Sequence, residues 1–491
     1  MAVFDWGGLT ALVYLSSWII VVGSLFVVPR NRRPGSATAW LMLIVLLPYV
    51  GLLLFWLIGT PKLSRRRRAL QRRIDEQIAA EVATIRDDPL LAPLFAPVIP
   101  DRYEPFVTLT TNLSGMPACI GNIVDLLPDY EGAIRRMTEA VRAARDYVHV
   151  QFYIVAMDDT TEPFLRALED AVRRGVTVRM LVDHVGARKF PRRRALEKRM
   201  RAAGVDWRWM LPLRPFSNEW NRPDLRNHRK VLVVDGLVAF TGSLNMIDRS
   251  YLLRRNRRLG LHYVDLHARV TGPVVAELDA AFHTDWYSET GMALPRPLIP
   301  DAASVPRRGT LCQVLPSGSG YDDDNNLKVF VGIIHAARRR LVITSPYFVP
   351  DDALMTAITS AAQRGVHVTL YSSAIADQLL VYHAQRSYYE QLLVAGVEIR
   401  LLRTPALLHA KHITVDDDIA VIGSSNLDMR SLTLNLEITL LAYDRGVVRS
   451  LRGVETAYHM GSDALSLDVW RRRSLGSQLL GNLARLTAAL Q

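Results

Sequence analysis

The 491-residue sequence predicts an α/β protein made of two repeated halves about a pseudo-twofold axis, preceded by a transmembrane hairpin of two helices. Three observations support this fold class. The chain begins with two long uncharged stretches, its remainder repeats internally, and each repeat alternates short apolar runs with amphipathic helical patterns. A chain of this length is expected to hold more than one structural unit.

The first element is the N-terminal hairpin. Residues 9–28 and 39–60 carry no charge, and each stretch approaches the ~20 apolar residues that cross a bilayer core. No basic region precedes the first stretch, so a cleaved signal peptide fits poorly. The linker contains Arg30, Arg32 and Arg33, and a larger basic cluster begins at Lys62. The two stretches predict a multi-pass membrane protein, and the positive-inside rule then places the rest of the chain in the cytoplasm.

A charged helix is expected next, from Leu63 to Asp87, followed by the Pro-interrupted stretch 89–100. Its arginines lie beside a predicted span, where contact with an anionic membrane surface is favoured over a merely solvated face. We therefore divide the chain into a hairpin (1–62), a basic juxtamembrane helix and linker (63–103), a first half (104–300) and a second half with a C-terminal helix (301–491).

Internal similarity defines the two halves. Residues 143–159 resemble 336–352, 173–183 resemble 363–373, and 202–210 resemble 394–402. In each half, apolar runs alternate with helical patterns, which predicts sheets covered on both faces. Four glycines are expected at helix C-termini: Gly175, Gly204, Gly365 and Gly396.

Each half ends in the same motif, His-x-Lys-x-x-x-x-Asp followed by Gly-Ser-x-Asn. The first copy runs from His228 to Asn245 and the second from His409 to Asn426. Five residue types at matching offsets are hard to obtain by chance, so the motif predicts a shared function. The matched residues are His228, Lys230, Asp235, Gly242 and Asn245 in the first copy, and His409, Lys411, Asp416, Gly423 and Asn426 in the second.

Each histidine shares a strand face with the lysine two residues later, whereas Asp235 and Asp416 face the other way and are assigned to supporting hydrogen bonds. Two imidazoles, two ammonium groups and two amides together suit an anion such as a phosphodiester. One histidine would attack phosphorus while the other protonates the leaving oxygen and then deprotonates the incoming hydroxyl.

The attacking histidine needs an acceptor for its second ring nitrogen. The second half supplies Glu437, 28 residues past His409, and the first half supplies Asp265, 37 residues past His228. We assign the histidine-orienting role to these two acids. No metal-ligand spacing occurs, so no metal is implied.

The composition limits the kinds of partner that the protein is expected to bind. Lys and Arg number 60 against 48 Asp and Glu, a formal charge of +12 that suggests an anionic partner. Two cysteines, Cys119 and Cys312, make neither a disulfide framework nor a zinc cluster. No repeated aromatic and basic pattern suits base stacking, so nucleic acid is not expected as a partner. The sequence does not decide the oligomeric state, and a homo-oligomer remains open.

These motifs resemble those of the phospholipase D superfamily and, within it, the bacterial cardiolipin synthases. The resemblance includes 31–51, 226–236, 269–275, 345–354 and 423–437. It implies two phospholipase D-like halves and transfer of a phosphatidyl group between two phosphatidylglycerol molecules, giving cardiolipin and glycerol without a cofactor. It also implies His228 as the nucleophile and His409 as the acid and base. The substrate phosphate would contact Lys230, Lys411, Asn245, Asn426, Ser243 and Ser424, although Ser243 stands where the family is expected to have a second glycine.

Four alternatives remain. A membrane-bound phospholipase D would transfer the same group to water, and a related phosphatidyltransferase would use another donor such as phosphatidylethanolamine. A nuclease of the superfamily would act on nucleic acid, which two bilayer spans fit poorly. A non-catalytic lipid-binding scaffold would not need the intact duplicated motif.

Overall fold

The computed structural model describes residues 6–30, 32, 34–59, 62–213, 222–295, 305–306, 309–375 and 378–486. It contains two compact units, Met1–Leu63 and Ser64–Gln491. We refer to them as the N-terminal unit and the main unit.

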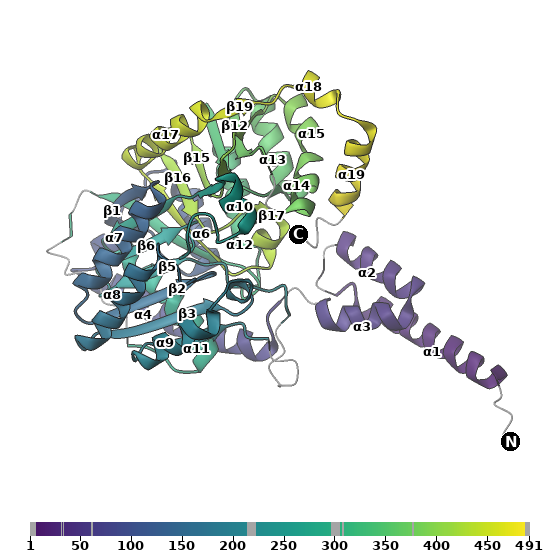
Figure 1. Cartoon of the computed structure of the whole chain (residues 1–491), viewed down its shortest axis with the longest axis horizontal. Coiled ribbons are helices and arrows are strands. Elements are labelled where there is room, and N and C mark those ends of the chain that lie inside the picture. Colours follow the sequence, from purple (N-terminus) through teal and green to yellow (C-terminus); the bar gives the residue numbers. More distant parts are fainter. Residues whose placement is uncertain are drawn as a thin grey trace. The chain divides into compact units, whose positions relative to one another are not determined.

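The N-terminal unit contains three apolar helices, α1 (Trp6–Val27), α2 (Pro34–Leu46) and α3 (Pro48–Ile58). Among the described residues, α1 alone is both long and apolar enough to cross a bilayer. The prediction of one helix over 39–60 is wrong, because α2 ends at Leu46 and a second helix, α3, begins at Pro48. Proline lacks the amide hydrogen that a continuous helix requires and clashes with the preceding turn. Figure 1 shows α2 lying beside α3.

The main unit is built on one sheet of 15 strands, in the order β19-β13-β12-β10-β15-β16-β18-β9-β1-β8-β6-β5-β2-β3-β4. The order reads symmetrically outward from the central β9–β1 pair, as a pseudo-twofold axis requires, with β19 added at one edge. Cys119 and Cys312 are register partners across this central pair, and both are free and buried. The two halves therefore share one continuous sheet (Figure 1).

Corresponding strands have similar lengths in the two halves. The first half contains β1 (Cys119–Leu127), β2 (Tyr147–Phe152), β3 (Thr177–Asp183), β4 (Asp206–Met210), β5 (Val231–Val234), β6 (Val238–Gly242), β7 (His262–Val264) and β8 (His267–Thr271). The second half contains β9 (Thr310–Ser317), β10 (Arg340–Thr344), β11 (Phe348–Val349), β12 (His367–Ser373), β13 (Glu398–Leu402), β14 (Ala406–Leu408), β15 (His412–Val415), β16 (Ile419–Gly423), β17 (Leu427–Asp428), β18 (Glu437–Tyr443) and β19 (Ser462–Ala464).

Helices cover the sheet. Those up to the end of the first half are α4 (Arg65–Asp87), α5 (Ala92–Phe95), α6 (Glu104–Ser114), α7 (Tyr130–Ala143), α8 (Glu162–Arg173), the short 3₁₀ helix η1 (Gly186–Lys189), α9 (Arg193–Ala202), α10 (Arg254–Leu259) and α11 (Val274–Thr290). The second half has α12 (Asn325–Ala336), α13 (Asp352–Gln363), α14 (Leu379–Arg386), α15 (Tyr389–Val394), α16 (Met429–Thr433), α17 (Arg445–Met460), α18 (Leu467–Arg471) and α19 (Leu475–Leu486).

Local sequence explains these elements. The inner strand β5 is a run of Val and Leu with every residue buried, as a sheet covered on both faces demands. Helix α8 turns its apolar residues inward, including Phe164 and Leu168. The four predicted C-terminal glycines all have φ between 89° and 93°, a conformation that glycine adopts without steric cost.

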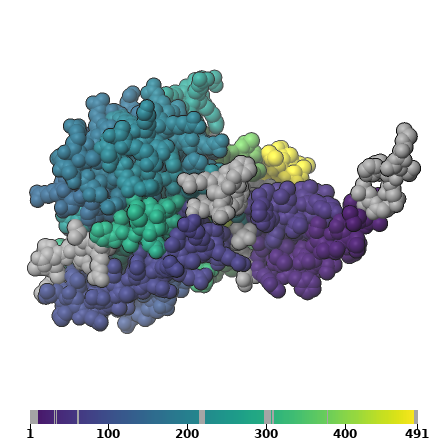
Figure 2. Space-filling view, turned by 90° about the horizontal axis from the view of Figure 1, so that it is seen from below, coloured from purple at the N-terminus to yellow at the C-terminus, as the bar shows by residue number. Residues whose placement is uncertain are grey.

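The predicted charged helix after the N-terminal unit is present as α4, which packs on α11. Not all of its arginines face solvent. Arg67 is buried and makes two hydrogen bonds to the Glu289 carboxylate, of 2.6 and 2.8 Å. Figure 2 shows the segment that contains α4, in dark blue, on the surface of the main unit. At least one member of the basic run therefore attaches α4 to the main unit.

Candidate active site

The two motif histidines lie in extended segments that lead into the inner strands β5 and β15. Each segment is bonded to the opposite half of the molecule. His228 N donates to Leu436 O at 2.8 Å, and His409 N donates to Val264 O at 2.7 Å. The residues that follow these acceptors in the chain are Glu437 and Asp265. The backbone therefore brings each predicted acid to the histidine of the other half.

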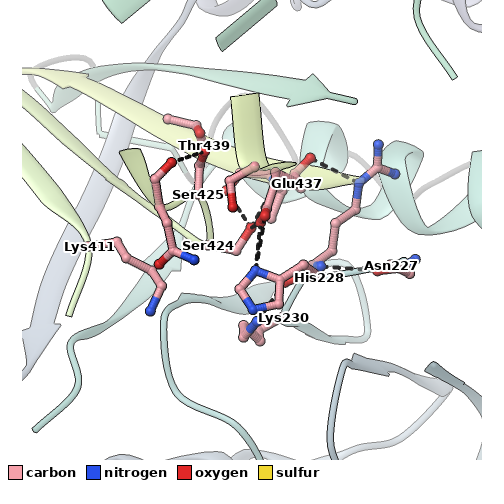
Figure 3. A network of polar contacts seen from close by, with 12 residues as sticks. Asn227, His228, Lys230, Lys411, Ser424, Ser425, Glu437 and Thr439 are labelled. Carbon is pink, nitrogen blue, oxygen red and sulfur yellow. Dashed lines mark hydrogen bonds and ion pairs between the residues drawn. The ribbon is translucent and has the colours of Figure 1, made fainter. Parts of the chain in front are cut away.

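The His228 ring points at Glu437, with Nδ1 3.0 Å from both carboxylate oxygens (Figure 3). The Ser424 hydroxyl donates to Glu437 Oε2 at 2.5 Å and accepts from Ile438 N at 3.0 Å. Glu437 is completely buried. With Nδ1–H donated to this carboxylate, the lone pair of Nε2 is left for chemistry.

His409 has a corresponding partner. Its Nδ1 lies 2.7 Å from Asp265 Oδ1, and Asp265 is buried. Ser243 holds the neighbouring backbone, since its hydroxyl donates to Leu266 O at 3.1 Å and accepts from Leu266 N at 2.9 Å. The site thus contains two histidine–acid pairs.

Each acid follows the histidine of its own half in the sequence, but each acid bonds the histidine of the other half. Glu437 belongs to the second half and bonds His228, whereas Asp265 belongs to the first half and bonds His409. The parallel pairs β7–β14 and Asn227–Leu436 join the two halves next to these acids. They bring each acid to the histidine of the other half. Sequence offsets within one half contain no information about such an exchange.

The two lysines lie beside the histidines and are almost completely buried. Lys230 Nζ donates to His228 O at 2.6 Å and lies 5.5 Å from the centre of the Tyr153 ring. Lys411 Nζ makes the equivalent bond to His409 O. Burial lowers the pKa of Lys230 to about 7, although the Glu437 carboxylate opposes the shift. Buried ammonium groups beside two imidazoles make a site that favours a bound anion.

The electrostatics of the first pair favour a neutral histidine. Burial lowers the pKa of His228 well below its usual value, and Lys230, Lys411 and His409 lower it further. Burial also raises the pKa of Glu437 to about 7, against the effects of Lys230 and Ser424. Two of the groups that lower the pKa of His228, His409 and Lys411, belong to the second motif.

The acid of the second histidine–acid pair has a pKa shift opposite to that of Glu437. Burial alone would raise the pKa of Asp265, but His409 and then Lys411 outweigh it and lower this pKa to about 2. Burial lowers the pKa of His409, and the adjacent Asp265 charge opposes that shift. The pKa of His409 is therefore lowered overall, as is that of His228, but the Asp265 carboxylate opposes this shift.

Most of the predicted phosphate-binding residues already make hydrogen bonds within the protein. Asn245 Oδ1 accepts from Ile154 N at 3.3 Å, and its Nδ2 donates to the Tyr251 hydroxyl at 2.9 Å. Asn426 Oδ1 is buried without a hydrogen-bond partner in the described part of the chain. The Ser424 hydroxyl bonds Glu437 itself, and the Ser243 hydroxyl bonds the backbone of Leu266, next to Asp265, which favours a positioning role over direct phosphate contact.

The motif aspartates make the supporting hydrogen bonds predicted for them. Asp235 accepts from three successive backbone amides, Arg145 to Tyr147, at 2.8–2.9 Å. Asp416 accepts from the equivalent amides, Arg338 to Arg340, at 2.8–3.3 Å. Both bind the segment before an adjacent strand, so they fix the sheet and leave the chemistry to the histidines.

Sequence reasoning missed the buried arginine between the first histidine and lysine. Arg229 bonds Asp285 Oδ2 at 2.8 Å and Glu437 O at 3.0 Å, and Asn227 Nδ2 also donates to Asp285. The second motif has Ala410 at the same place. This difference between otherwise matching motifs is the signal that could have revealed the Arg229–Asp285 pair.

Aromatic rings around the histidines were also missed. Tyr153 meets the His228 ring edge-on at 5.1 Å between centroids. Tyr251 and Tyr263 flank His409 at 6.0 and 5.5 Å. No repeat pattern marks these tyrosines, because one ring faces the first histidine and two face the second.

Comparison with known proteins agrees with this geometry. The family model described as "Cardiolipin synthase, PLD-like domain" matches residues 137–286 and 330–454, and the one described as "Phospholipase_D-nuclease N-terminal" matches 17–59. Cardiolipin synthase A of Proteus mirabilis is 35% identical over 97% of both chains. Cardiolipin synthase A of Pectobacterium atrosepticum is 33% identical over 96% of both chains.

A solved structure supports the fold. The phosphatidylserine synthase of Haemophilus influenzae superposes on 79% of this chain and 98% of its own, with a TM-score of 0.56 and 15% sequence identity. The two matched domains coincide with the two halves that carry the histidine–acid pairs. The chain therefore belongs to the cardiolipin synthase family of phospholipase D-like proteins.

Proposed function

We propose that this protein synthesises cardiolipin by transferring a phosphatidyl group from one phosphatidylglycerol to another, with release of glycerol. The observation that carries the proposal is the pair of buried histidine–acid dyads beside two lysines, in a chain related to cardiolipin synthase A over almost its whole length. The apolar N-terminal unit supports a reaction at a membrane with lipid substrates.

In the first step, His228 Nε2 attacks phosphorus and the bond from phosphorus to the glycerol oxygen breaks. The protonated Nε2 of His409 gives its proton to that oxygen, so glycerol leaves and a phosphatidyl-histidine remains. The neutral state favoured for His228 suits the attacking group. The ionised Asp265 suits a partner that must hold a proton.

In the second step, a headgroup hydroxyl of another phosphatidylglycerol attacks the same phosphorus. His409, now neutral, takes the hydroxyl proton, the phosphorus–nitrogen bond breaks, and cardiolipin is released. Lys230, Lys411, Asn245 and Asn426 would stabilise the charge that develops on the phosphate oxygens. Ser424 and Ser243 would position the acids rather than touch substrate. No cofactor is needed for either step.

We infer that the main unit is cytoplasmic and that the enzyme acts at the bacterial inner membrane. The basic residues that follow α3, from Lys62 through Arg68, support this orientation under the positive-inside rule. An anionic headgroup would also be attracted to the positive charge of the chain.

The test supplies purified full-length protein in vesicles with phosphatidylglycerol alone. Cardiolipin and free glycerol in equal amounts are expected. Phosphatidic acid without cardiolipin would instead identify a hydrolase. Cardiolipin formed only after phosphatidylethanolamine is added would identify another donor. The exposed His335→Ala variant is the matched control for loss of a histidine outside the site.

A further inference from the structure

The second apolar stretch folds back on itself. The rings of Trp40 in α2 and Phe55 in α3 meet edge-on, with centroids 5.5 Å apart. Residues 15 positions apart in one straight helix would be separated by about 22 Å along its axis. Helices α2 and α3 are therefore packed side by side, and neither continues the other.

Two residues explain the reversal. Pro48 begins α3 and prevents a continuous helix through Leu47. Gly51, one turn later, lies so close to α2 that a Cβ atom there would be 2.7 Å from Ile44 Cα. Only glycine permits this approach. The turn still satisfies its backbone, since Leu47 N bonds Leu43 O and Gly51 N bonds Leu47 O, as an environment without water requires.

The two ends of the α2–α3 hairpin come together. Arg32, just before α2, stacks on the Phe55 ring at 4.6 Å and donates to Gly59 O at the end of α3. The chain therefore enters and leaves the hairpin at the same end. This end is also the C-terminal end of α1, because only Val28 to Arg33 separate α1 from α2.

The turn of the hairpin reaches only part of the way along α1. The Tyr49 hydroxyl contacts Ser16 Oγ at 2.5 Å and Val13 O at 3.2 Å. From Ser16 to Val27 is a rise of about 16 Å, roughly half of a hydrocarbon core of ~30 Å. By contrast, the 22 residues of α1 rise about 33 Å, enough to cross the core.

Lipid is the environment that these surfaces fit. Large apolar side chains project outward from all three helices, including Trp18 at 66%, Leu46 at 78% and Trp56 at 76% exposure. No acidic or basic residue lies within α1, α2 or α3. Water would make such exposure unfavourable at about 25 cal/mol per Å² of apolar surface.

We propose that the N-terminal unit crosses the bilayer once, through α1, and that α2 and α3 form a re-entrant hairpin. The hairpin enters and leaves at the membrane face where α1 ends. Arg30, Arg32 and Lys62 then lie at one face, and Arg65 to Arg68 follow Lys62 directly in the chain. Two full crossings would put Arg30 and Arg32 on the face opposite Lys62, against the positive-inside rule. One crossing with a re-entrant hairpin puts all of these charges on the cytoplasmic side.

Single cysteines test this topology in full-length protein in bacterial membranes. Ala2→Cys, Ser36→Cys and Ala69→Cys mark the start of the chain, the start of α2 and the main unit. A membrane-impermeant maleimide is added to right-side-out and to inverted vesicles. We expect residues 36 and 69 to react from the cytoplasmic face and residue 2 from the opposite face. The unsubstituted chain gives the background, which should be small because Cys119 and Cys312 are buried.

Reaction of residues 2 and 69 from one face and residue 36 from the other would overturn the proposal and establish two crossings. A second measurement does not depend on vesicle sidedness. Spin labels at Ala39→Cys and Trp56→Cys, both exposed, should remain close in the hairpin, whereas one straight helix would separate them by about 25 Å. A separation near that value would also contradict the proposal. Neither readout requires the protein to make cardiolipin.

Discussion

The two histidine–acid pairs are alike in geometry and unlike in electrostatics. His228 faces a glutamate whose pKa burial raises to about 7, and His409 faces an aspartate whose pKa is lowered to about 2, chiefly because the His409 ring outweighs burial. The first ring meets one tyrosine and the second ring meets two. Both ring pKa values are lowered, but the acid behind His228 has a raised pKa and the acid behind His409 a lowered one, so the two copies of the motif differ in the acid that each histidine faces.

Under the proposed mechanism, this asymmetry makes the acid behind each ring the feature that sets the role of that ring. The motif residues themselves, His-x-Lys, are the same in both halves. A nucleophile needs a free lone pair, and a general acid needs a stabilised proton. If the comparison is sound, disabling corresponding residues in the two halves must produce different defects.

The largest expected effect comes from removing a histidine. His228→Ala should abolish the acid-labile phosphatidyl-enzyme and reduce turnover by about 10⁴-fold or more, because the imidazole that forms the bond to phosphorus in the proposed mechanism is lost. His409→Ala should still form the adduct, but about 10²–10⁴-fold more slowly, since only proton transfer is lost. The measurement is trapping of radiolabelled protein after rapid acid-free denaturation. An adduct that persists in His228→Ala and disappears in His409→Ala would reverse the assignment.

The acids should give the next largest effects. Glu437→Gln should slow adduct formation by about 10²–10⁴-fold, because an amide can favour the wrong tautomer of His228. Asp265→Asn should slow both adduct formation and its discharge to cardiolipin, because His409 moves a proton in each step. Rapid-quench kinetics separate the two steps. If Glu437→Gln slowed discharge as much as adduct formation, as Asp265→Asn is expected to do, the proposed distinction between the halves would be removed.

Arg229 and Ala410 occupy the same position in the two motifs, so a substitution of Arg229 tests what the charged residue contributes to the free energy of unfolding. Arg229→Met should destabilise the main unit by about 3–5 kcal/mol, because it leaves Asp285 buried without its charged partner. Thermal unfolding of the purified protein measures the loss. The double variant Arg229→Met/Asp285→Leu should recover much of it, since the second half manages with an alanine at this position. A double variant no more stable than the single one would show that the pair is not the cause.

Much of this arrangement could be predicted from the sequence. The repeated segments predict the symmetric order of strands around β9 and β1, and the period-two spacing predicts that each histidine lies beside its lysine. The odd offset of Asp235 and Asp416 predicts that they face away from the site. These predictions depend on local periodicity. They put each histidine and lysine within a strand, whereas the structure has both in the extended segment just before β5 or β15.

The exchange of Glu437 and Asp265 could not be predicted in this way. It depends on contacts between residues 209 positions apart, such as His228 and Glu437, which arise only when the two half-sheets join. The reversal of the chain at Pro48 could not be predicted from hydropathy, for a different reason. Hydropathy counts apolar residues and ignores direction, so a hairpin and a span of equal composition look the same. Pro48 followed by Gly51 was the available signal, since the pair combines a helix break with a close approach.

The smallest expected effect is the pH dependence of the intact enzyme. Glu437 must be ionised to accept the Nδ1 proton of His228, and its pKa is about 7. Adduct formation should therefore fall up to about tenfold per pH unit as pH drops below about 7. Asp265, with a pKa of about 2, stays ionised over the same range and contributes no such decline. Glu437→Gln should remove the fall in the rate of adduct formation at low pH and leave a low rate that does not change with pH. Asp265→Asn should keep this fall, the low-pH limb of the profile. A limb that survives in Glu437→Gln and vanishes in Asp265→Asn would assign the titrating group to the other half and exchange the roles of the two histidines.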